Sequence, residues 1–238
     1  MSTSLASAHN TADPLFSYPR QAAFGRVLPK SKIYEHSRAN GRLKALFVAQ
    51  VERITWSYKL APETLNISAS KQVPEIQVFS IALKAPTLHE DVLRCIDSAV
   101  QYPVLFELTY EGKVQLKACY KRPAAGKGQG GNPASSKWQG SDYFASPWLK
   151  DDTPRKPMPI ALNMTALYEQ LLRQLIPLAA REKESLADLV ERAGQVRAKQ
   201  KEIEQVQARL GRERQFNRKV EINAQLRQLK TEFDELSY

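Results

Sequence analysis

The alternation of apolar and polar positions is most regular between Ser185 and Leu236. Apolar residues recur there at spacings of three and four, in two series: Leu186, Leu189, Ala193, Val196 and Ile203, then Ile222, Leu226, Leu229, Phe233 and Leu236. Charged residues fill most of the remaining positions. A stripe this narrow is buried only against another helix, so we predict a coiled-coil extension over residues 181–238. One long stuttered helix and a hairpin bending between Gly211 and Glu221 both fit the pattern. A hairpin or docking arm is favoured over a long parallel dimer.

The middle of the chain has an α+β pattern. Residues 73–84 read as a buried strand, and residues 104–110 and 113–120 read as a hairpin around Glu111-Gly112. Between them lies an amphipathic helix that ends before Pro103, with Thr87 and Glu90 as a capping box. This helix would be a crossover connection if the strands on either side are parallel. A strand near Tyr143 and Phe144 follows, and then an apolar helix capped by Asn163.

These elements predict an α+β domain over residues 31–180, with a mixed sheet of about four to five strands covered by helices. Residues 1–30, which contain Pro14, Pro19 and Pro29, read as an extended N-terminal arm. A helix of four turns is predicted from the apolar spacing of Leu43, Phe47, Val51, Ile54 and Tyr58. Residues 122–136 read as a loop rich in glycine and proline.

Composition indicates a soluble cytoplasmic protein. The hydrophobic fraction is 42%, and no apolar run approaches the roughly 20 residues that span a bilayer. The first ten residues lack the basic start and apolar stretch of a secretory signal, so no signal peptide is expected. Cys95 and Cys119 form no CxxC pair, which fits a reducing compartment better than a disulfide or zinc framework.

The net charge of +10 is concentrated outside the helical tail. Residues 181–238 hold thirteen basic and eleven acidic side chains, whereas residues 1–180 hold twenty-two basic and fourteen acidic ones. Such an excess favours a polyanionic partner, DNA or RNA. The strongest cluster has one acid, Glu35, among five cations, and a second group surrounds the glycine-rich loop. The nucleic-acid-binding candidates are Lys30, Lys32, Arg38, Arg42, Lys44, Lys121, Arg122 and Lys127.

Motifs for catalysis are weak. The glycine-rich loop at residues 126–131 is followed by Pro133 and by no Lys-Ser/Thr pair, so a surface loop is favoured over a phosphate cradle. A metal-dependent nuclease would need carboxylates and a lysine around magnesium, and its candidates are Asp97, Glu107, Glu111 and Lys113. Three histidines, His9, His36 and His89, do not cluster. We therefore predict no catalytic residues, no metal and no cofactor.

The aromatic residues allow two interpretations. Trp56, Trp138 and Trp148, with Tyr143 and Phe144, could stack on bases, but ordinary core and edge packing is favoured. The tail contains a polar stretch around residues 215–223, which is unusual for a plain coiled coil. It is either a turn between two helices or a contact surface for a partner. The partner-binding candidates are Gln215, Phe216, Asn217, Arg218 and Asn223.

Several stretches together resemble one family. They are residues 29–36, 46–64, 73–79, 102–106, 167–172 and 215–221, the last reading Gln-Phe-Asn-Arg-Lys-Val-Glu. They are similar to an uncharacterised prokaryotic domain family whose members are commonly encoded beside Swi/Snf-type helicases and DNA methyltransferases, in restriction or antiviral gene clusters. The resemblance covers most of residues 28–230. It implies a context among DNA-processing enzymes and carries no catalytic positions with it.

We expect a non-catalytic accessory subunit of a bacterial DNA-modification or anti-phage defence complex. Its C-terminal helices would dock a helicase or methyltransferase subunit, and its basic globular part would contact DNA or RNA. Two alternatives stay open. The first is a metal-dependent nuclease subunit that uses Glu107, Glu111 and Lys113, and the second is a structural homodimer formed through residues 185–236.

Overall fold

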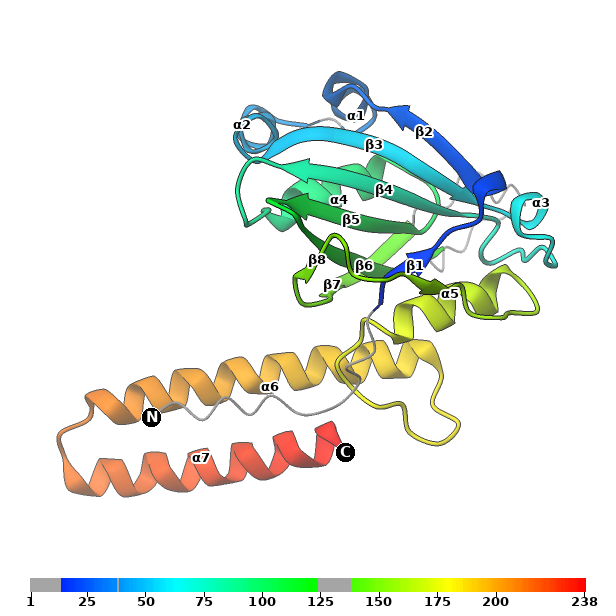
Figure 1. Ribbon diagram of the computed structural model, residues 1–238. Helices are drawn as coiled ribbons and strands as arrows, with labels where there is room; N and C mark the ends of the chain where they lie inside the picture. The colour runs from blue at the N-terminus through cyan, green and yellow to red at the C-terminus, as the bar shows by residue number, and fades with distance from the viewer. Residues whose placement is uncertain (1–13, 38, 124–137) are drawn as a thin grey trace, which may run out of the picture. The chain divides into compact units, whose positions relative to one another are not determined.

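The computed structural model describes residues 14–37, 39–123 and 138–238 (Figure 1). The described chain divides into two compact units, a globular unit that ends at Leu175 and a helical unit from Ile176 to Tyr238. None of the helices in the described residues has both the length and the apolar character that a membrane crossing requires.

The globular unit is built on a seven-stranded mixed sheet. Its strand order is β2-β3-β4-β5-β6-β7, and the short strand β8 also pairs with β6. The strands are β2 (Ala23–Val27), β3 (Val51–Leu60), β4 (Ile76–Leu83), β5 (Val104–Tyr110), β6 (Lys113–Pro123), β7 (Trp138–Ala145) and β8 (Leu149–Lys150). A separate two-stranded sheet pairs β1 (Phe16–Ser17) with β9 (Lys156–Pro157) in parallel. The α+β class is confirmed, with more strands than the four to five expected.

Two of the additional strands come from regions that the sequence pattern assigned differently. Part of the expected arm forms β2, which pairs with β3 along one edge of the sheet. The prediction of a four-turn helix from Leu43 to Tyr58 is wrong. The helix α2 (Gly41–Gln50) ends at Gln50, and the strand β3 begins at Val51. Residues 51–60 contain several β-branched and aromatic side chains, which favour a strand. Ile54 lies directly opposite Ile81 of β4, and both are buried.

The crossover between β4 and β5 is confirmed. These strands pair in parallel, with Phe79 opposite Phe106, and α4 (Glu90–Ala99) connects them. In Figure 1 this helix lies behind the sheet. The predicted Thr87 cap is wrong, since α4 begins after His89, whose Nδ1 accepts a hydrogen bond from the Asp91 amide at 3.2 Å.

One core cluster fills the space between this face of the sheet and its helices. Besides α4, the cluster includes α1 (Lys30–Ser37) and α2. The side chains that meet there are Ile33, Phe47, Val92, Ile96, Phe79 and Phe106. Because α1 and α4 also contact each other, residues from β2 and α1 are held beside the C-terminal end of α4. This arrangement positions the cleft described below.

The turn between β5 and β6 matches the hairpin predicted at Glu111-Gly112. Both residues have positive φ angles, 44° and 70°, as a two-residue hairpin turn of the primed type requires. Along β6 the predicted alternation is also found, with Val114, Leu116 and Ala118 buried.

The remaining helices of the globular unit are the short α3 (Pro62–Leu65), the 3₁₀ turn η1 (Arg20–Ala22) and α5 (Met164–Arg173). Asn163 caps α5 as predicted, accepting a hydrogen bond from the Ala166 amide at 2.9 Å. The buried Tyr168 of α5 joins the helix to β6. Its hydroxyl donates to the Cys119 carbonyl and accepts from the Lys121 amide, each at 2.8 Å.

The helical unit is a hairpin of two long helices, one of the two forms that the sequence allows. They are α6 (Leu186–Arg212), capped by Ser185 as expected, and α7 (Phe216–Ser237). Their shared seam buries Ile203, Val206, Ile222, Leu226 and Leu229. The chain reverses at residues 213–215, just after Gly211. There the Glu213 carboxylate accepts hydrogen bonds from the amides of Arg214 and Gln215, at 2.8 and 2.9 Å.

Candidate functional site

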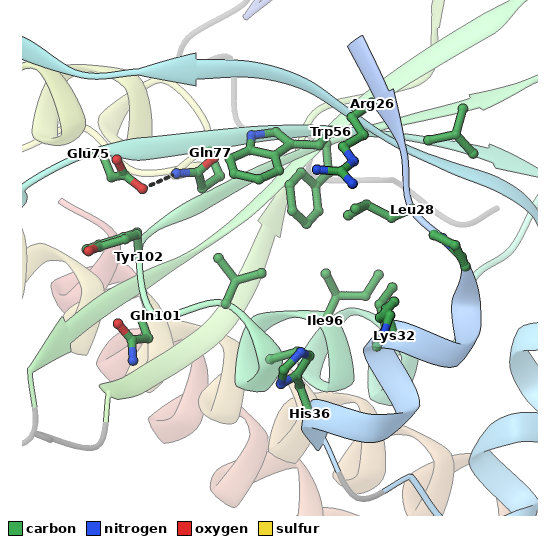
Figure 2. A pocket seen from close by; sticks show the side chains of 16 residues that line it. Arg26, Leu28, Lys32, His36, Trp56, Glu75, Gln77, Ile96, Gln101 and Tyr102 are labelled. Atoms are coloured by element: carbon green, nitrogen blue, oxygen red, sulfur yellow. Dashed lines mark hydrogen bonds between the residues drawn. The ribbon is translucent and has the colours of Figure 1, made fainter. Parts of the chain in front are cut away.

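A cleft of about 590 Å³ opens in the globular unit between β2, α1 and the C-terminal end of α4 (Figure 2). Its volume falls in the range of small-molecule sites. The walls combine apolar side chains with a few polar and basic ones. The aromatic, polar and charged lining residues include Arg26, Lys32, His36, Trp56, Glu75, Gln77, Gln101 and Tyr102.

Trp56 forms a fixed aromatic wall of this cleft. Its indole Nε1 donates to the Tyr58 carbonyl at 3.1 Å, and its ring lies 4.1 Å from the ring of Phe24, centroid to centroid. Phe79 meets the same indole edge-on, with centroids 6.1 Å apart. These contacts hold the ring in one orientation, so an entering flat group would meet a preformed surface.

Arg26 reaches the cleft because β2 contains a bulge. The register between β2 and β3 shifts between Ala23 and Arg26, and Gly25 between them has a φ of 65°, which favours glycine. The shift places Arg26 directly opposite Trp56. In Figure 2 the Arg26 side chain points into the cleft beside the indole. Arg26 is exposed, and no described carboxylate lies within ion-pair distance of it.

The acidic side of the cleft is largely neutralised. Glu75 is paired with Lys59 at 2.9 Å and accepts a hydrogen bond from the Gln77 amide nitrogen at 2.5 Å. On the basic side, Lys32 has a solvent-exposed pair with Glu35 in the next turn of α1, a kind of pair that contributes little. The unneutralised charge that lines the cleft is therefore positive.

The cations predicted to bind nucleic acid separate into two groups. Lys32, Arg42, Lys44 and Arg122 are exposed, and Lys44 lies over the Tyr34 ring at 5.6 Å. Lys30 is half-buried and points inward, where its ammonium donates to the carbonyls of Phe47 and Val51 at the end of α2. Arg38 and Lys127 lie outside the described residues.

Lys121 is the clearest departure from that prediction. It is 5% exposed, and its ammonium donates to the carbonyls of Asp97, Val100 and Tyr102, where α4 ends. The Asp97 carboxylate lies 3.6 Å from the same nitrogen. A lysine held in this way offers no surface to a polyanion, contrary to the prediction that Lys121 binds nucleic acid.

Lys121 belongs to a buried polar cluster with Asp97, Tyr143 and Cys119. The Tyr143 hydroxyl donates to Asp97, and the Cys119 thiol lies 3.5 Å from the same carboxylate oxygen. Burial lowers the pKa of Lys121 and raises the pKa of Asp97, and each partner opposes the shift of the other. Burial also raises the pKa values of Tyr143 and Cys119, so both stay protonated. This cluster ties α4 to β6 and β7.

The nuclease candidates do not come together. Glu107 makes a two-pronged salt bridge with Arg155, at 2.7 and 3.0 Å, and Arg155 also donates to the Phe16 carbonyl. Glu111 is exposed in the hairpin turn, and Asp97 is engaged in the buried cluster. Across the described residues, no three His, Cys, Asp or Glu side chains are grouped as metal ligands.

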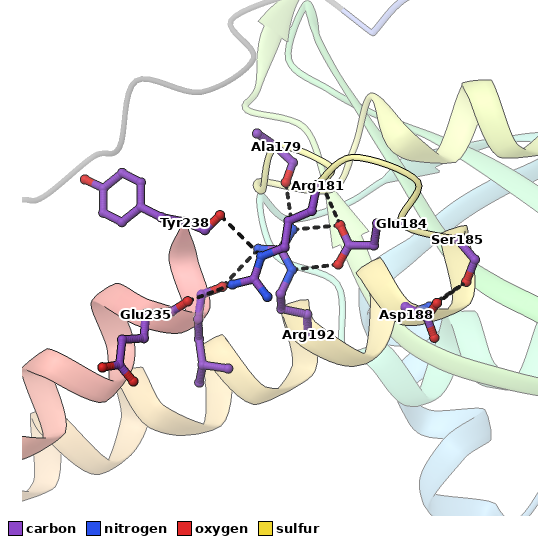
Figure 3. Close-up of polar contacts among 9 residues, drawn as sticks. Ala179, Arg181, Glu184, Ser185, Asp188, Arg192, Glu235 and Tyr238 are labelled. Atoms are coloured by element: carbon purple, nitrogen blue, oxygen red, sulfur yellow. Dashed lines mark hydrogen bonds and ion pairs between the residues drawn. The ribbon is translucent and has the colours of Figure 1, made fainter.

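In the helical unit, the base of the hairpin is held by two arginines (Figure 3). Arg192 of α6 is buried and binds the Glu184 carboxylate through two nitrogens, at 2.7 and 2.9 Å. It also donates to the carbonyls of Ala179 and Leu236. Arg181 donates to the carbonyls of Glu235 and Tyr238. The last carbonyls of α7 are thereby satisfied by side chains.

The opposite end of the hairpin carries the partner-binding candidates. Gln215, Phe216, Asn217, Arg218 and Asn223 are all exposed there, at the start of α7. Phe216 is 78% exposed, and Val220, one turn later, is 50% exposed. Their spacing of four residues places both on one side of the helix. We call the exposed residues 215–220 the hairpin tip.

The sequence pattern does not predict the cleft as a site. It indicates Lys32 as a nucleic-acid contact and allows base stacking by Trp56, but it does not indicate Arg26, Gln77 or Tyr102. Five elements and three connections contribute to the lining, and no local motif links them. Gly25 followed by Arg26 is the one local signal that could have indicated a bulge at this edge.

Comparison with known proteins identifies a family. The family model described as Domain of unknown function (DUF4391) matches residues 16–233. The match includes the described elements of both units, so the chain belongs to this family. Neither a curated protein nor a solved structure matches the chain. The function is therefore argued from the residues above.

Proposed function

We propose that this member of the DUF4391 family is a non-catalytic accessory subunit of a bacterial DNA-modification or anti-phage defence complex. The hairpin tip docks a helicase or methyltransferase subunit, and the exposed cations of the globular unit contact DNA or RNA. The observation that carries the proposal is the exposed apolar pair Phe216 and Val220 on a hairpin whose own seam is already filled.

The hairpin tip has the composition of a protein-binding surface. An exposed aromatic side chain beside an arginine and amides resembles the centre of many interfaces, where aromatic and arginine residues contribute most of the binding energy. The five buried seam residues contact each other across α6 and α7. Phe216 and Val220 are not among them, so the hairpin does not need them for its own packing.

Nucleic-acid contact is supported by the exposed cations of the globular unit. Arg26, Arg42, Lys32 and Lys44 are exposed on β2, α1 and α2. Binding of this kind weakens with salt. Each phosphate contact contributes about 0.9 for duplex DNA, or about 0.7 for a single strand, to the slope of log K against log salt concentration.

Co-purification with the products of neighbouring helicase and methyltransferase genes tests the docking role. We expect the double variant Phe216→Ala and Val220→Ala to weaken complex formation about tenfold or more, with helix content unchanged. Val48→Ala is the matched control, because Val48 is 61% exposed but lies in α2 of the globular unit. Equal binding by the tip variant and the control would contradict docking through the tip.

Salt titration tests the nucleic-acid role. Replacing Arg42 and Lys44 with glutamine should reduce the salt slope by about 1.8 for duplex DNA and by about 1.4 for a single strand. The control replaces Lys113 and Lys150 with glutamine, because these exposed lysines face each other across β6 and β8, outside the predicted basic segment. An unchanged slope in the first variant would contradict a role for the basic segment.

A further inference from the structure

We infer that the cleft beside Trp56 binds one unstacked nucleotide of a single-stranded nucleic acid. This inference rests on the proposed function, in which the globular unit contacts nucleic acid, and it names the part of the strand that the unit recognises. The argument comes from the aromatic wall, the placement of charge and the hydrogen-bonding groups of the cleft.

The aromatic wall fits a base. Proteins that hold single strands stack bases on fixed aromatic side chains, whatever the base, because every base has a flat π face. The Trp56 indole is held by Phe24, by Phe79 and by its hydrogen bond to the Tyr58 carbonyl. A base that enters the cleft therefore meets a ring whose orientation is already set.

The charges fit a phosphate. Arg26 lies opposite Trp56 across the β2–β3 ladder, so one ligand could meet both a cation and a ring. Two features of the cleft would repel an anion, the Glu75 carboxylate and the carbonyls at the end of α4. Both are neutralised, the first by Lys59 and the second by the buried ammonium of Lys121. Charge complementarity therefore favours an anionic group joined to a flat ring.

The unpaired amide oxygen of Gln77 indicates that the flat ring of the ligand is a nucleic-acid base. It lines the cleft and is 2% exposed, and its amide nitrogen is committed to Glu75. Its amide oxygen has no hydrogen-bond partner among the described residues. A buried acceptor without a donor is unfavourable, and the amino groups of adenine, cytosine and guanine are donors. Gln101 and Tyr102 add further polar groups at the same wall.

Fluorescence of Trp56 provides a direct test. In a background of Trp138→Phe and Trp148→Phe, Trp56 is the remaining tryptophan of the chain. Titration with eight-nucleotide single strands should quench its emission to saturation. A strand of equal length and charge with abasic sites should bind about tenfold more weakly, because it cannot stack. Equal binding of the abasic strand would overturn the inference.

Two charge reversals complete the test. Arg26→Glu should weaken strand binding about tenfold or more, whereas Arg53→Glu should have a smaller effect, because Arg53 is exposed on the adjacent strand β3 but does not line the cleft. Circular dichroism checks that both variants fold. Equal weakening by the two variants would also overturn the inference.

The outcomes separate this inference from the proposed function. If intact strands bind with a salt slope that responds to Arg42 and Lys44, but neither Arg26→Glu nor abasic sites matter, the cleft is not the site and the nucleic-acid role survives. If no strand binds at low salt, the nucleic-acid role and the inference both fail. If a free mononucleotide binds as tightly as the strand, the occupant is a free nucleotide and the inference of a strand is overturned.

Discussion

The ends of α4 in the globular unit and of α7 in the helical unit are both closed by buried cations, but with different chemistry. At α4 the single ammonium of Lys121 donates hydrogen bonds to three carbonyls. The Asp97 carboxylate lies 3.6 Å from the same nitrogen. At α7 the Arg192 guanidinium donates to the Leu236 carbonyl. It also donates to the Ala179 carbonyl, which precedes α6, and binds the Glu184 carboxylate at 2.7 and 2.9 Å.

The difference shows how each type of cation tolerates burial. Burial lowers the pKa of Lys121 and raises that of Asp97, so each charge at α4 depends on the other. A guanidinium stays charged, and its planar donors match a carboxylate, so the pKa of Glu184 is held near 2, chiefly by its hydrogen bonds to Arg192. The end of α4 should therefore be the more fragile of the two.

Lys121→Met should have the largest effect. It leaves three carbonyls and the Asp97 carboxylate without their cation, and removing one partner of a buried pair costs about 3–5 kcal/mol. Urea unfolding of the full chain measures the loss. Lys117→Met is the control, because Lys117 is only half-buried on the same strand. A loss below about 1 kcal/mol for Lys121→Met would contradict its role at the end of α4.

Arg192→Met should have the next largest effect, about 2–4 kcal/mol, confined to the hairpin. Faster amide hydrogen exchange in the last turns of α7 would report it. Lys199→Met is the matched control, since Lys199 pairs with Glu232 across α6 and α7 at 2.8 Å but is less buried. Solvent screens such a pair, so it contributes little to stability. Similar exchange in the two variants would show that the arginine contacts do not stabilise the base.

Acid should weaken the helical unit through Glu184. Its pKa is about 2 when folded, below the ordinary value of 4.5, so its stabilisation is fully present above about pH 4.5 and is lost as pH falls towards 2. The expected loss is about 2 kcal/mol, because the Glu184 side chain is 9% exposed and little screened by solvent.

Unfolding at a series of pH values, followed by helix content, measures this dependence. Glu184→Gln should be less stable at neutral pH and lose less stability between pH 4.5 and 2. The same steep acid loss in the glutamine variant would place its origin elsewhere.

The sequence predicts those helices and strands well whose apolar residues recur with a regular spacing. The helix α4, the β5–β6 hairpin and a helical tail are all predicted, because apolar spacing and turn residues define them locally. The parallel pairing around α4 and the bend in the tail stay open in the sequence. The prediction of a helix from Leu43 to Tyr58 is wrong. Val51 and Ile54 have the spacing of a helical stripe, but they pair with residues of β4. The strand is selected by contacts that the local pattern does not contain.

The candidate site was less predictable, for a related reason. Lys30 and Lys121 resembled surface cations because no acidic residue lies beside them in the sequence. Their partners are mostly backbone carbonyls at helix ends, and these leave no residue signature. Conversely, Arg26 meets Trp56 only through the bulge in β2, so their relation depends on strand pairing rather than on spacing.

The Tyr168 hydroxyl has a further consequence for β6. It accepts from the Lys121 amide and donates to the Cys119 carbonyl, as the backbone of a neighbouring strand would. An amide and a carbonyl left open at this point would form a template on which the strand of another molecule could pair. By filling that position from a helix, the protein protects a stretch of its sheet from intermolecular pairing and aggregation without lengthening a strand.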